Sequence, residues 1–184
     1  MVNYQEAKGW LSKNEREYLR NVAIGYATIL NVGIEYGASL HCFNSSNKKI
    51  VAIDLIGASK LNGIDAFSNV QLLDTQSGYT FKLEGMQNGL AVITGDSNKI
   101  TLQNFLPEVT FIDGGHDYQC VKNDIKRFAK ITQTYLLFHD YSDLPMHSGV
   151  KQALDEWQSS DFEFVAQVDT IRAYKRLKTD SGNT

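Results

Sequence analysis

The chain has 184 residues, 42% of them hydrophobic, which is enough to bury the core of one domain and too few for two. Its 18 basic and 21 acidic side chains give a formal net charge of -3 without a long basic run, so the composition excludes a nucleic-acid partner held by charge. No apolar run approaches the ~20 residues that cross a bilayer, and residues 1–15 lack the apolar region of a signal peptide. We therefore expect a soluble, cytoplasmic protein without a membrane partner, folded as one domain over residues 1–184 with an N-terminal helical extension over residues 1–27.

The first half of the chain alternates predicted strands with predicted helices. Ser12 and Glu15 have the spacing of a capping box, which predicts that a first helix begins at Lys13. Short apolar runs rich in β-branched residues predict buried strands at residues 27–34, 48–55 and 90–94. Helical spacing predicts helices at residues 13–26, 38–43, 79–88 and 99–105. Residues 57–78, rich in Gly, Ser, Asn and Asp, predict a loop with a short helical piece near residues 64–67.

The second half gives a clearer pattern of the same kind. Strands are predicted at residues 109–112, 135–138, 162–168 and 170–177, and helices at residues 117–132 and 149–157. Asp169 between the last two strands indicates a tight hairpin, so an antiparallel strand closes an otherwise parallel sheet. The predicted fold class is α/β: a Rossmann-like, doubly wound, mostly parallel sheet with an antiparallel C-terminal strand, in three layers α/β/α.

Polar side chains follow two of these strands where each one ends. Asp113, His116 and Asp117 come after the strand at residues 109–112, and His139 and Asp140 follow the strand at residues 135–138. Ligands of open α/β sheets bind at the carboxyl ends of the strands, so we expect these side chains to surround one crevice. Such a density of titratable groups indicates a functional site.

The ends of the earlier strands favour an adenosine-containing ligand without a diphosphate. Gly33 and Gly37 form a turn between strand and helix but lack the GxGxxG spacing of dinucleotide sites, so the turn suits an amino-acid carboxylate. The alternative is that these glycines only let strand and helix pack closely. Asp54 ends the second strand, where an acid can bind both ribose hydroxyls or else cap a turn. Asp96 and Ser97 end the third and can approach an adenine edge.

The motifs resemble those of class I S-adenosylmethionine-dependent methyltransferases. More narrowly, IDGGHDYQCVKNDI, FHDY and GVKQALDEW are similar to the IDGDHSYEGVKKDL, FHDY and GVKRAVDEF patterns of the small methyltransferases of the macrocin O-methyltransferase and cephalosporin-hydroxylase type, methyltransferase family 24. GWLSKNE, residues 9–15, is similar to their opening helix. The resemblance covers nearly the whole chain and departs from the family at Asn31 and Gly115, where the relatives carry acids.

This resemblance implies roles for particular residues. The implied S-adenosylmethionine-binding residues are Asn31, Gly33, Glu35, Gly37, Ser39, Asp54, Leu55, Asp96, Ser97 and Asp113. Asp113 would lie beneath the sulfonium, and His116 would be the general base that deprotonates the acceptor, a task suited to its reference pKa of ~6.5. His41 and His147 look uninvolved, although His147 falls in the loop after the fifth strand, where it could line an acceptor pocket.

In metal-dependent relatives, residues equivalent to Asp113, His139 and Asp140 hold a divalent cation. The candidate ions are Mg²⁺, Mn²⁺ and Zn²⁺, and because histidine is a softer donor than Mg²⁺ prefers, the expectation shifts toward Mn²⁺, Zn²⁺ or no metal. Whether a metal is required stays open at this point.

The predicted function is S-adenosylmethionine-dependent O-methylation of a small hydroxylated metabolite or sugar, which would be the methyl acceptor. Two alternatives remain open: a metal-dependent hydrolase or hydroxylase on the same fold, and a non-catalytic cofactor-binding module. Homo-oligomer formation is left open as well.

Overall fold

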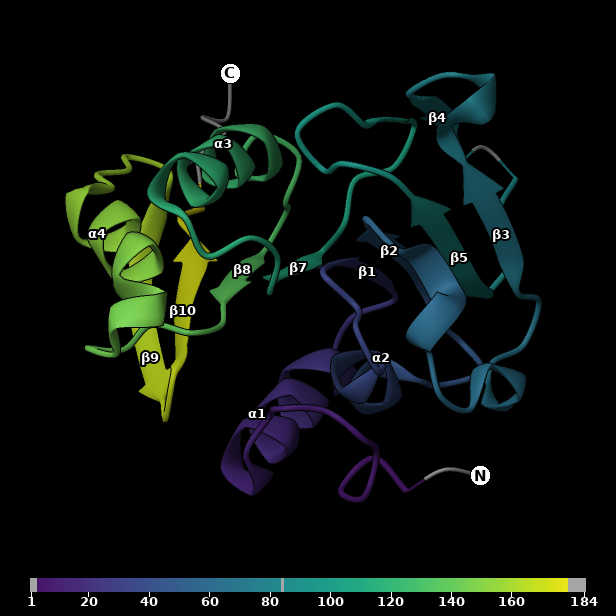
Figure 1. Ribbon diagram of the computed structural model, residues 1–184, viewed down its shortest axis with the longest axis horizontal. Coiled ribbons are helices and arrows are strands. Elements are labelled where there is room, and N and C mark those ends of the chain that lie inside the picture. The colour runs from purple at the N-terminus through teal and green to yellow at the C-terminus, as the bar shows by residue number, and fades with distance from the viewer. Residues whose placement is uncertain (1–2, 84, 179–184) are drawn as a thin grey trace, which may run out of the picture.

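A mostly parallel β-sheet forms the centre of the fold (Figure 1). The computed structural model describes residues 3–83 and 85–178, and within these ranges eight strands join in the order β3-β5-β2-β1-β7-β8-β10-β9. The strands span, in chain order, β1 Thr28–Val32, β2 Lys49–Asp54, β3 Gln71–Asp74, β5 Gly89–Thr94, β7 Val109–Ile112, β8 Tyr135–Phe138, β9 Phe162–Val168 and β10 Ile171–Arg176. Strands β9 and β10 pair antiparallel with each other, and β10 pairs antiparallel with β8.

Helices cover both faces of this sheet, which confirms the predicted three layers. They are α1 Lys13–Ile24, α2 Ala38–Phe43, α3 Tyr118–Phe128 and α4 Ser148–Glu156. Figure 1 shows α1 and α2 on one side of the sheet and α3 and α4 on the other. In the described ranges, no helix has the length and apolarity needed to span a membrane.

The central strands are apolar at consecutive positions because both of their faces are buried. On β2, Ile50 packs into the apolar cluster that contains Leu19 of α1, whereas Val51 packs into the cluster that contains Val121 of α3. A strand covered on both faces has no solvent-facing position to fill with polar residues. This is why the continuous apolar runs predicted these strands correctly.

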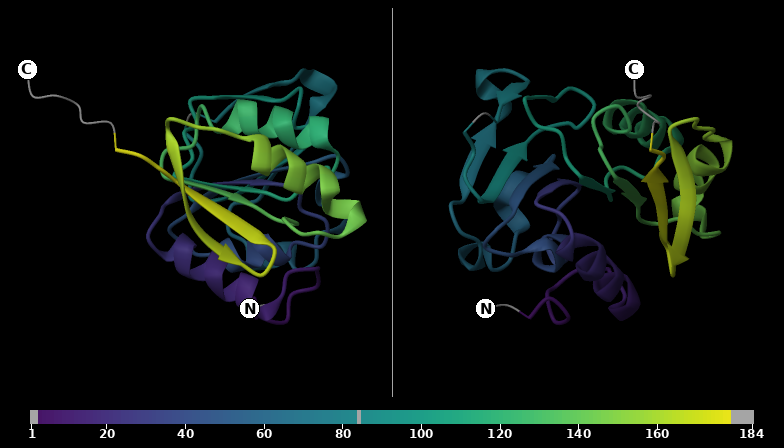
Figure 2. Two further views of the ribbon diagram at one scale, coloured as in Figure 1. Left: turned by 90° about the vertical axis from the view of Figure 1, so that its left-hand side faces the viewer. Right: turned by 180° about the vertical axis from the view of Figure 1, so that it is seen from behind.

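Both ends of the chain contain local structure that the sequence predicted. The capping box of α1 is formed: Glu15 N donates to Ser12 Oγ at 3.1 Å, and Ser12 N donates to Glu15 Oε2 at 2.7 Å. The β9–β10 hairpin turns at Asp169, whose φ of 48° is left-handed. Figure 2 shows this hairpin in yellow, as a long arm at one end of the sheet. Strand β10 thereby closes the parallel sheet with an antiparallel partner, as expected.

Two predicted helices are wrong. Residues 79–88 contain strand β4 (Thr80–Lys82) and residues 99–105 contain strand β6 (Thr101–Gln103), which pair in parallel as a separate two-stranded sheet. In each strand only the middle residue is partly buried, with exposed neighbours on both sides, which is the two-residue period of a strand. Three residues are too few to reveal that period against a competing helical spacing.

The predicted loop at residues 57–78 also contains more structure than expected. It forms short 3₁₀ turns at residues 57–60, 64–66 and 75–77, and the edge strand β3, which pairs in parallel with β5. Strand β3 is mostly exposed and so lacks an apolar run that would have revealed it.

Candidate active site

A pocket of about 850 Å³ opens at the carboxyl ends of the parallel strands. It lies where β1 is flanked by β2 on one side and β7 on the other, so the strand order reverses at this point. Crevices at such switch points are the ligand sites of open α/β sheets, and the volume is in the range of pockets that enclose a small molecule. Within the described residues, the pocket contains most of the predicted site residues: Gly33, Glu35, Ser39, Asp54, Leu55, Asp96, Ser97, Asp113, His116, His139 and Asp140.

Close approach of two backbone segments forms the floor of this pocket. Gly33 has a left-handed φ of 84°, and a Cβ at this position would lie 1.9 Å from the carbonyl oxygen of Asp113. Only glycine fits this turn, because any side chain would displace the loop after β7. Packing of the β1 and β7 ends therefore requires glycine at position 33, and it leaves the turn amides beside the pocket.

Asp54 ties the end of β2 to this same turn. Its Oδ2 accepts hydrogen bonds from the backbone N–H groups of Ile34 at 2.7 Å and Glu35 at 3.2 Å, and its Oδ1 accepts one from Ile56 N at 2.8 Å. The carboxylate thus shapes the turn, as one alternative predicted, and it also lines the pocket. Oδ2 uses both of its lone pairs in these bonds, whereas Oδ1 retains one for a ligand hydroxyl.

Asn31 and Gly37 do not belong to the lining that the described residues form. The Asn31 side chain is fully buried beneath the turn, and its Nδ2 donates to the carbonyl of Gly33 at 2.5 Å. Its Oδ1 has no hydrogen-bond partner in the described part of the chain. Gly37 precedes α2 with a φ of 92°, and a Cβ there would meet the side chain of Leu61. Asn31 and Gly37 therefore help to shape the turn without lining the pocket.

Asp124, which the sequence did not single out, joins the predicted pair Asp96 and Ser97. Ser97 Oγ donates to Asp124 Oδ1 at 2.8 Å, and both residues line the pocket. Burial raises the pKa of the Asp124 carboxyl to about 6. The end of the pocket next to β5 therefore carries a carboxyl that is protonated more readily than an aspartate in water.

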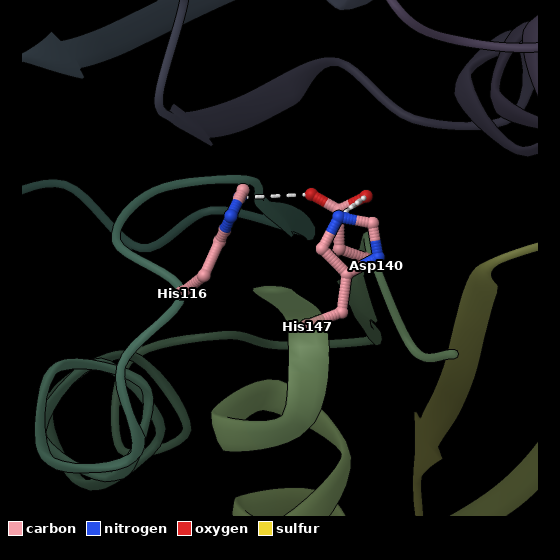
Figure 3. A group of neighbouring side chains, drawn as sticks. All are labelled: His116, Asp140 and His147. Carbon is pink, nitrogen blue, oxygen red and sulfur yellow. Dashed lines mark ion pairs between the residues drawn. The ribbon is translucent and has the colours of Figure 1, made fainter. Parts of the chain in front are cut away.

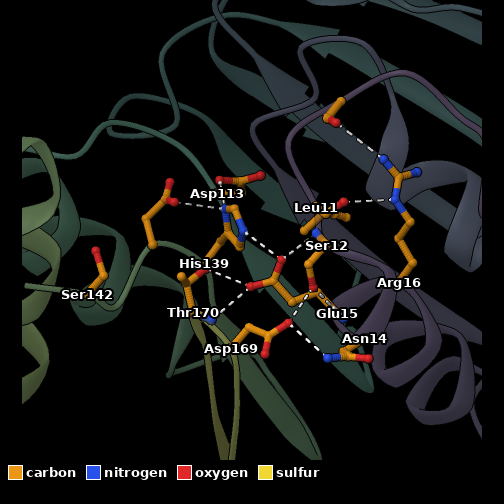
Figure 4. A network of polar contacts seen from close by, with 12 residues as sticks. Leu11, Ser12, Asn14, Glu15, Arg16, Asp113, His139, Ser142, Asp169 and Thr170 are labelled. Carbon is orange, nitrogen blue, oxygen red and sulfur yellow. Dashed lines mark hydrogen bonds and ion pairs between the residues drawn. The ribbon is translucent and has the colours of Figure 1, made fainter. Parts of the chain in front are cut away.

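A buried imidazole lies among three carboxylates at the opposite end (Figure 4). His139 Nδ1 is 3.0 Å from Asp113 Oδ1 and 3.3 Å from Asp140 Oδ1, and its Nε2 is 3.5 Å from Glu15 Oε2. Glu15 Oε1 in turn accepts hydrogen bonds from Thr170 N at 2.9 Å and Thr170 Oγ1 at 2.7 Å. This network joins helix α1, two strand ends and the β9–β10 hairpin around His139.

The network shifts the pKa values of all its members. Burial lowers the pKa of His139, but hydrogen bonds with Asp113, Asp140 and Glu15 outweigh it and raise that pKa to about 12. Burial raises the pKa of Glu15, but contacts with His139, Ser12 and Thr170 outweigh it and hold that pKa at about 2. Burial dominates at Asp113 and raises its pKa. These contacts favour the protonated, imidazolium form of His139.

On its outer side, Asp140 contacts two further histidines (Figure 3). Asp140 Oδ2 lies 2.9 Å from His116 Nε2, and Asp140 Oδ1 lies 3.3 Å from His147 Nε2. Contact with Asp140 raises the pKa of His116, against the opposing effect of burial. His147, which looked uninvolved in the sequence, lines the pocket with His116. In the sequence, the one indication that His147 belongs to the site was its position in the loop after β8.

The N-terminal segment supplies a wall that the sequence analysis did not assign to the site. Gly9, Trp10, Leu11, Ser12 and Glu15 all line the pocket. The sequence contained one indication of this wall, the motif GWLSKNE, which resembles the opening helix of the family but was given no role in the site.

The comparisons with known proteins agree with this geometry. A family model described as a methyltransferase domain matches residues 30–141, from β1 to the end of the loop after β8 that carries His139 and Asp140. The chain belongs to this methyltransferase family. It is an S-adenosylmethionine-dependent enzyme, and the match confirms the predicted family. No curated protein matches this methyltransferase.

Solved methyltransferase structures share the fold of this enzyme. Cofactor-bound Rv0187 from MTB is 13% identical, with a TM-score of 0.64 over 92% of this chain and 82% of that one. The O-methyltransferase from Bacillus cereus in complex with SAH is 15% identical, with a TM-score of 0.57 over 91% and 83%. MycE, from the mycinamycin biosynthetic pathway, in complex with Mg and SAH, is 15% identical, with a TM-score of 0.56 over 96% of this chain and 53% of MycE.

Proposed function

We propose that this methyltransferase transfers the methyl group of S-adenosylmethionine to a hydroxyl oxygen of a small molecule, with sugars among the candidate acceptors. The observation that carries this proposal is the His116–Asp140 pair, a base and its carboxylate partner 2.9 Å apart beside the pocket. Methylation of a hydroxyl requires removal of its proton, which a histidine near neutral pH performs. The structural neighbours named as O-methyltransferases support the same chemistry.

The pocket residues fit the methyl donor. The turn at Gly33 gives backbone amides close access to a ligand, and Asn31 holds this turn by donating to the carbonyl of Gly33. In the proposed arrangement, the turn from Gly33 to Ser39 holds the methionine portion, Asp54 the ribose, and Leu55 with Asp96 and Ser97 the adenine. Asp113 lies beneath the sulfonium. When bound, the donor supplies an electrophilic methyl group, and the protein supplies alignment.

His116 and Asp140 perform the proton transfer. In neutral His116 the Nε2–H donates to Asp140, so the lone pair lies on Nδ1. Nδ1 accepts the proton of the acceptor hydroxyl as its oxygen attacks the methyl carbon and the carbon–sulfur bond of the donor breaks, and Asp140 stabilises the imidazolium that forms. The side chain of His116 is 40% exposed, so an acceptor can reach it, while that of Asp140 is 12% exposed and held in place. Asp140 adopts a left-handed φ of 63°, which Asp tolerates better than most residues.

A cation at Asp113, His139 and Asp140 stays a prediction from the sequence. The three ligand atoms lie within 4.8 Å of one another. A metal ion needs the lone pair of a neutral imidazole, however, and both ring nitrogens of His139 already face carboxylates. As arranged, this group fits a proton better than a hard ion such as Mg²⁺, so the proposed reaction depends on His116 and Asp140.

The test combines donor binding with turnover. Calorimetry with S-adenosylhomocysteine should show binding by the wild type and by His116→Gln, because His116 contacts the acceptor and not the donor. Transfer of labelled methyl to a panel of sugars and phenols should fall by ~10²–10⁴-fold in His116→Gln. For the wild type, kcat/KM should rise with pH through the raised pKa of His116 and then level off.

His41→Gln is the matched control, since it removes an imidazole that bonds to the carbonyl of Asn62 away from the pocket lining. It should retain both donor affinity and turnover. Donor binding without turnover on any acceptor would favour a non-catalytic cofactor-binding module. Full activity of His116→Gln would refute the assignment of the base.

A further inference from the structure

The outer histidines and Asp140 form a group with the composition of a metal site. His116 comes from the loop after β7, Asp140 from the end of β8 and His147 from the turn before α4, and each offers one ligand atom within 4.8 Å of the others. Figure 3 shows both rings facing the carboxylate from different sides. Nothing in the methyl-transfer proposal requires His147, so its placement beside Asp140 needs a separate explanation.

The spacing of these atoms matches that of ligands around one ion. At metal–ligand distances of ~2.0–2.1 Å, two ligand atoms lie about 2.9 Å apart at a right angle and about 3.4 Å apart in a tetrahedron. The observed separations are 2.9 Å between His116 Nε2 and Asp140 Oδ2, and 3.3 Å between His147 Nε2 and Asp140 Oδ1. These two distances run to different oxygens of Asp140, and one ligand atom from each of the three residues lies within 4.8 Å of the others, so an ion between them would draw the side chains closer together.

The orientation of His147 is fixed by a second contact. Its Nδ1 lies 2.8 Å from the hydroxyl of Ser142. With the proton on Nδ1, the ring donates to Ser142 Oγ, and the lone pair of Nε2 points toward Asp140. Histidines that bind metals are held by this kind of hydrogen bond from the other ring nitrogen.

The surroundings favour a cation at the outer group over the inner one. Three carboxylates, from Glu15, Asp113 and Asp140, face the single buried imidazole of His139, so the neighbourhood is rich in negative charge. Both nitrogens of His139 are occupied by these contacts, whereas the Nε2 atoms of His116 and His147 converge on one carboxylate beside the pocket. Two nitrogen donors and one carboxylate suit Zn²⁺, Co²⁺ or Fe²⁺ better than Mg²⁺.

We propose that His116, Asp140 and His147 bind one borderline divalent cation of the Zn²⁺ class, through both Nε2 atoms and the Asp140 carboxylate. Three protein ligands leave at least one coordination position open toward the pocket, where an acceptor oxygen or water can bind. An ion on Nε2 leaves the proton of His116 on Nδ1, so it removes the lone pair that base catalysis requires. With an ion bound, the cation would acidify an acceptor hydroxyl that binds to it, in place of base catalysis by His116, and the proton would leave to water.

The test measures ion binding without donor or acceptor, so its outcome is separate from that of the methyl-transfer proposal. The full chain, freed of metal by a chelator, is titrated with Co²⁺ and followed by its visible ligand-field absorption, then with Zn²⁺ in competition. We expect one Co²⁺ per chain, displaced by Zn²⁺ and not by Mg²⁺. His147→Ala should weaken Co²⁺ binding by more than ~10-fold, and Ser142→Ala by ~10–100-fold.

Two control variants identify which group holds the ion. Asp113→Asn changes only the inner group and should leave Co²⁺ affinity unchanged, while Leu144→Ala changes the His147 loop without removing a donor atom and should do the same. Thermal unfolding checks that each variant is folded, and His147→Gln replaces His147→Ala if the latter is not. Binding lost in Asp113→Asn but retained in His147→Ala would overturn the proposal in favour of the inner group. No saturable binding to the wild type would overturn it outright.

Discussion

Replacing Gly33 with alanine tests whether the pocket floor depends on contact between the β1 turn and the loop after β7. The new Cβ would lie 1.9 Å from the carbonyl oxygen of Asp113, 2.5 Å from its carbonyl carbon and 3.0 Å from Gly114 N. These are backbone atoms, which cannot rotate away as a flexible side chain can. The loop that carries Asp113 must therefore shift, or the turn must open.

Two effects add up to the expected loss of stability. A left-handed backbone costs a residue with a Cβ about 1–2 kcal/mol, and an overpacked site costs a further ~1–3 kcal/mol. The sum of about 2–5 kcal/mol is a large part of the ~5–15 kcal/mol by which most domains are stable. For a chain of this length, each kcal/mol lowers Tm by about 2–4 °C.

Gly85→Ala is the matched control for this variant. Gly85 has a φ of 72°, close to the 84° of Gly33, but a Cβ there meets nothing within 4 Å. It should therefore lose only the backbone contribution of about 1–2 kcal/mol. Urea unfolding measures both variants, and calorimetry with S-adenosylhomocysteine should show weakened binding in Gly33→Ala alone. Equal urea midpoints for Gly33→Ala and Gly85→Ala would show that contact between the new Cβ and the Asp113 backbone does not destabilise the fold.

Three further predictions use carboxyl groups that line the pocket. Glu15→Gln should lower the unfolding free energy at pH 7 by on the order of 3 kcal/mol, because the pKa of Glu15 is lowered from 4.5 to about 2. This difference in unfolding free energy from wild type should shrink as pH falls from 4.5 toward 2. A difference that does not change with pH would contradict the prediction. Asp124 has the opposite sign, since its pKa is raised from 3.8 to about 6 and the neutral carboxyl stabilises the fold at low pH. Wild type should therefore lose stability relative to Asp124→Asn as pH rises from 4 to 8, by up to ~3 kcal/mol. Urea unfolding of both proteins at pH 4 and pH 8 measures this difference, and an equal difference at the two pH values would show that the pKa of Asp124 is not raised. Asp54→Ala removes the acceptor of three backbone N–H groups and should weaken S-adenosylhomocysteine binding by more than ~10-fold; unchanged affinity in calorimetry would remove Asp54 from the donor site.

The sequence by itself determined the features that depend on neighbouring residues. The capping box at Ser12 predicted the start of α1, the continuous apolar runs predicted the buried strands, and Asp169 predicted the hairpin. It also predicted one crevice for Asp113, His116, Asp117, His139 and Asp140, because adjacent parallel strands end at the same edge of a sheet. All of them line the pocket except Asp117, which instead caps helix α3. These predictions needed only local pattern and one rule of topology.

The tertiary structure alone decided which distant residues complete the site. Strands β4 and β6 were missed because each is stabilised by pairing with the other, some twenty residues away, and not by its own pattern. Glu15 reaches His139 only because α1 packs beside the β9–β10 hairpin, whose Thr170 holds the same carboxylate. His147 meets Asp140 through the turn before α4. Such contacts join segments far apart in the chain, and a pattern of neighbouring residues contains no information about how those segments pack.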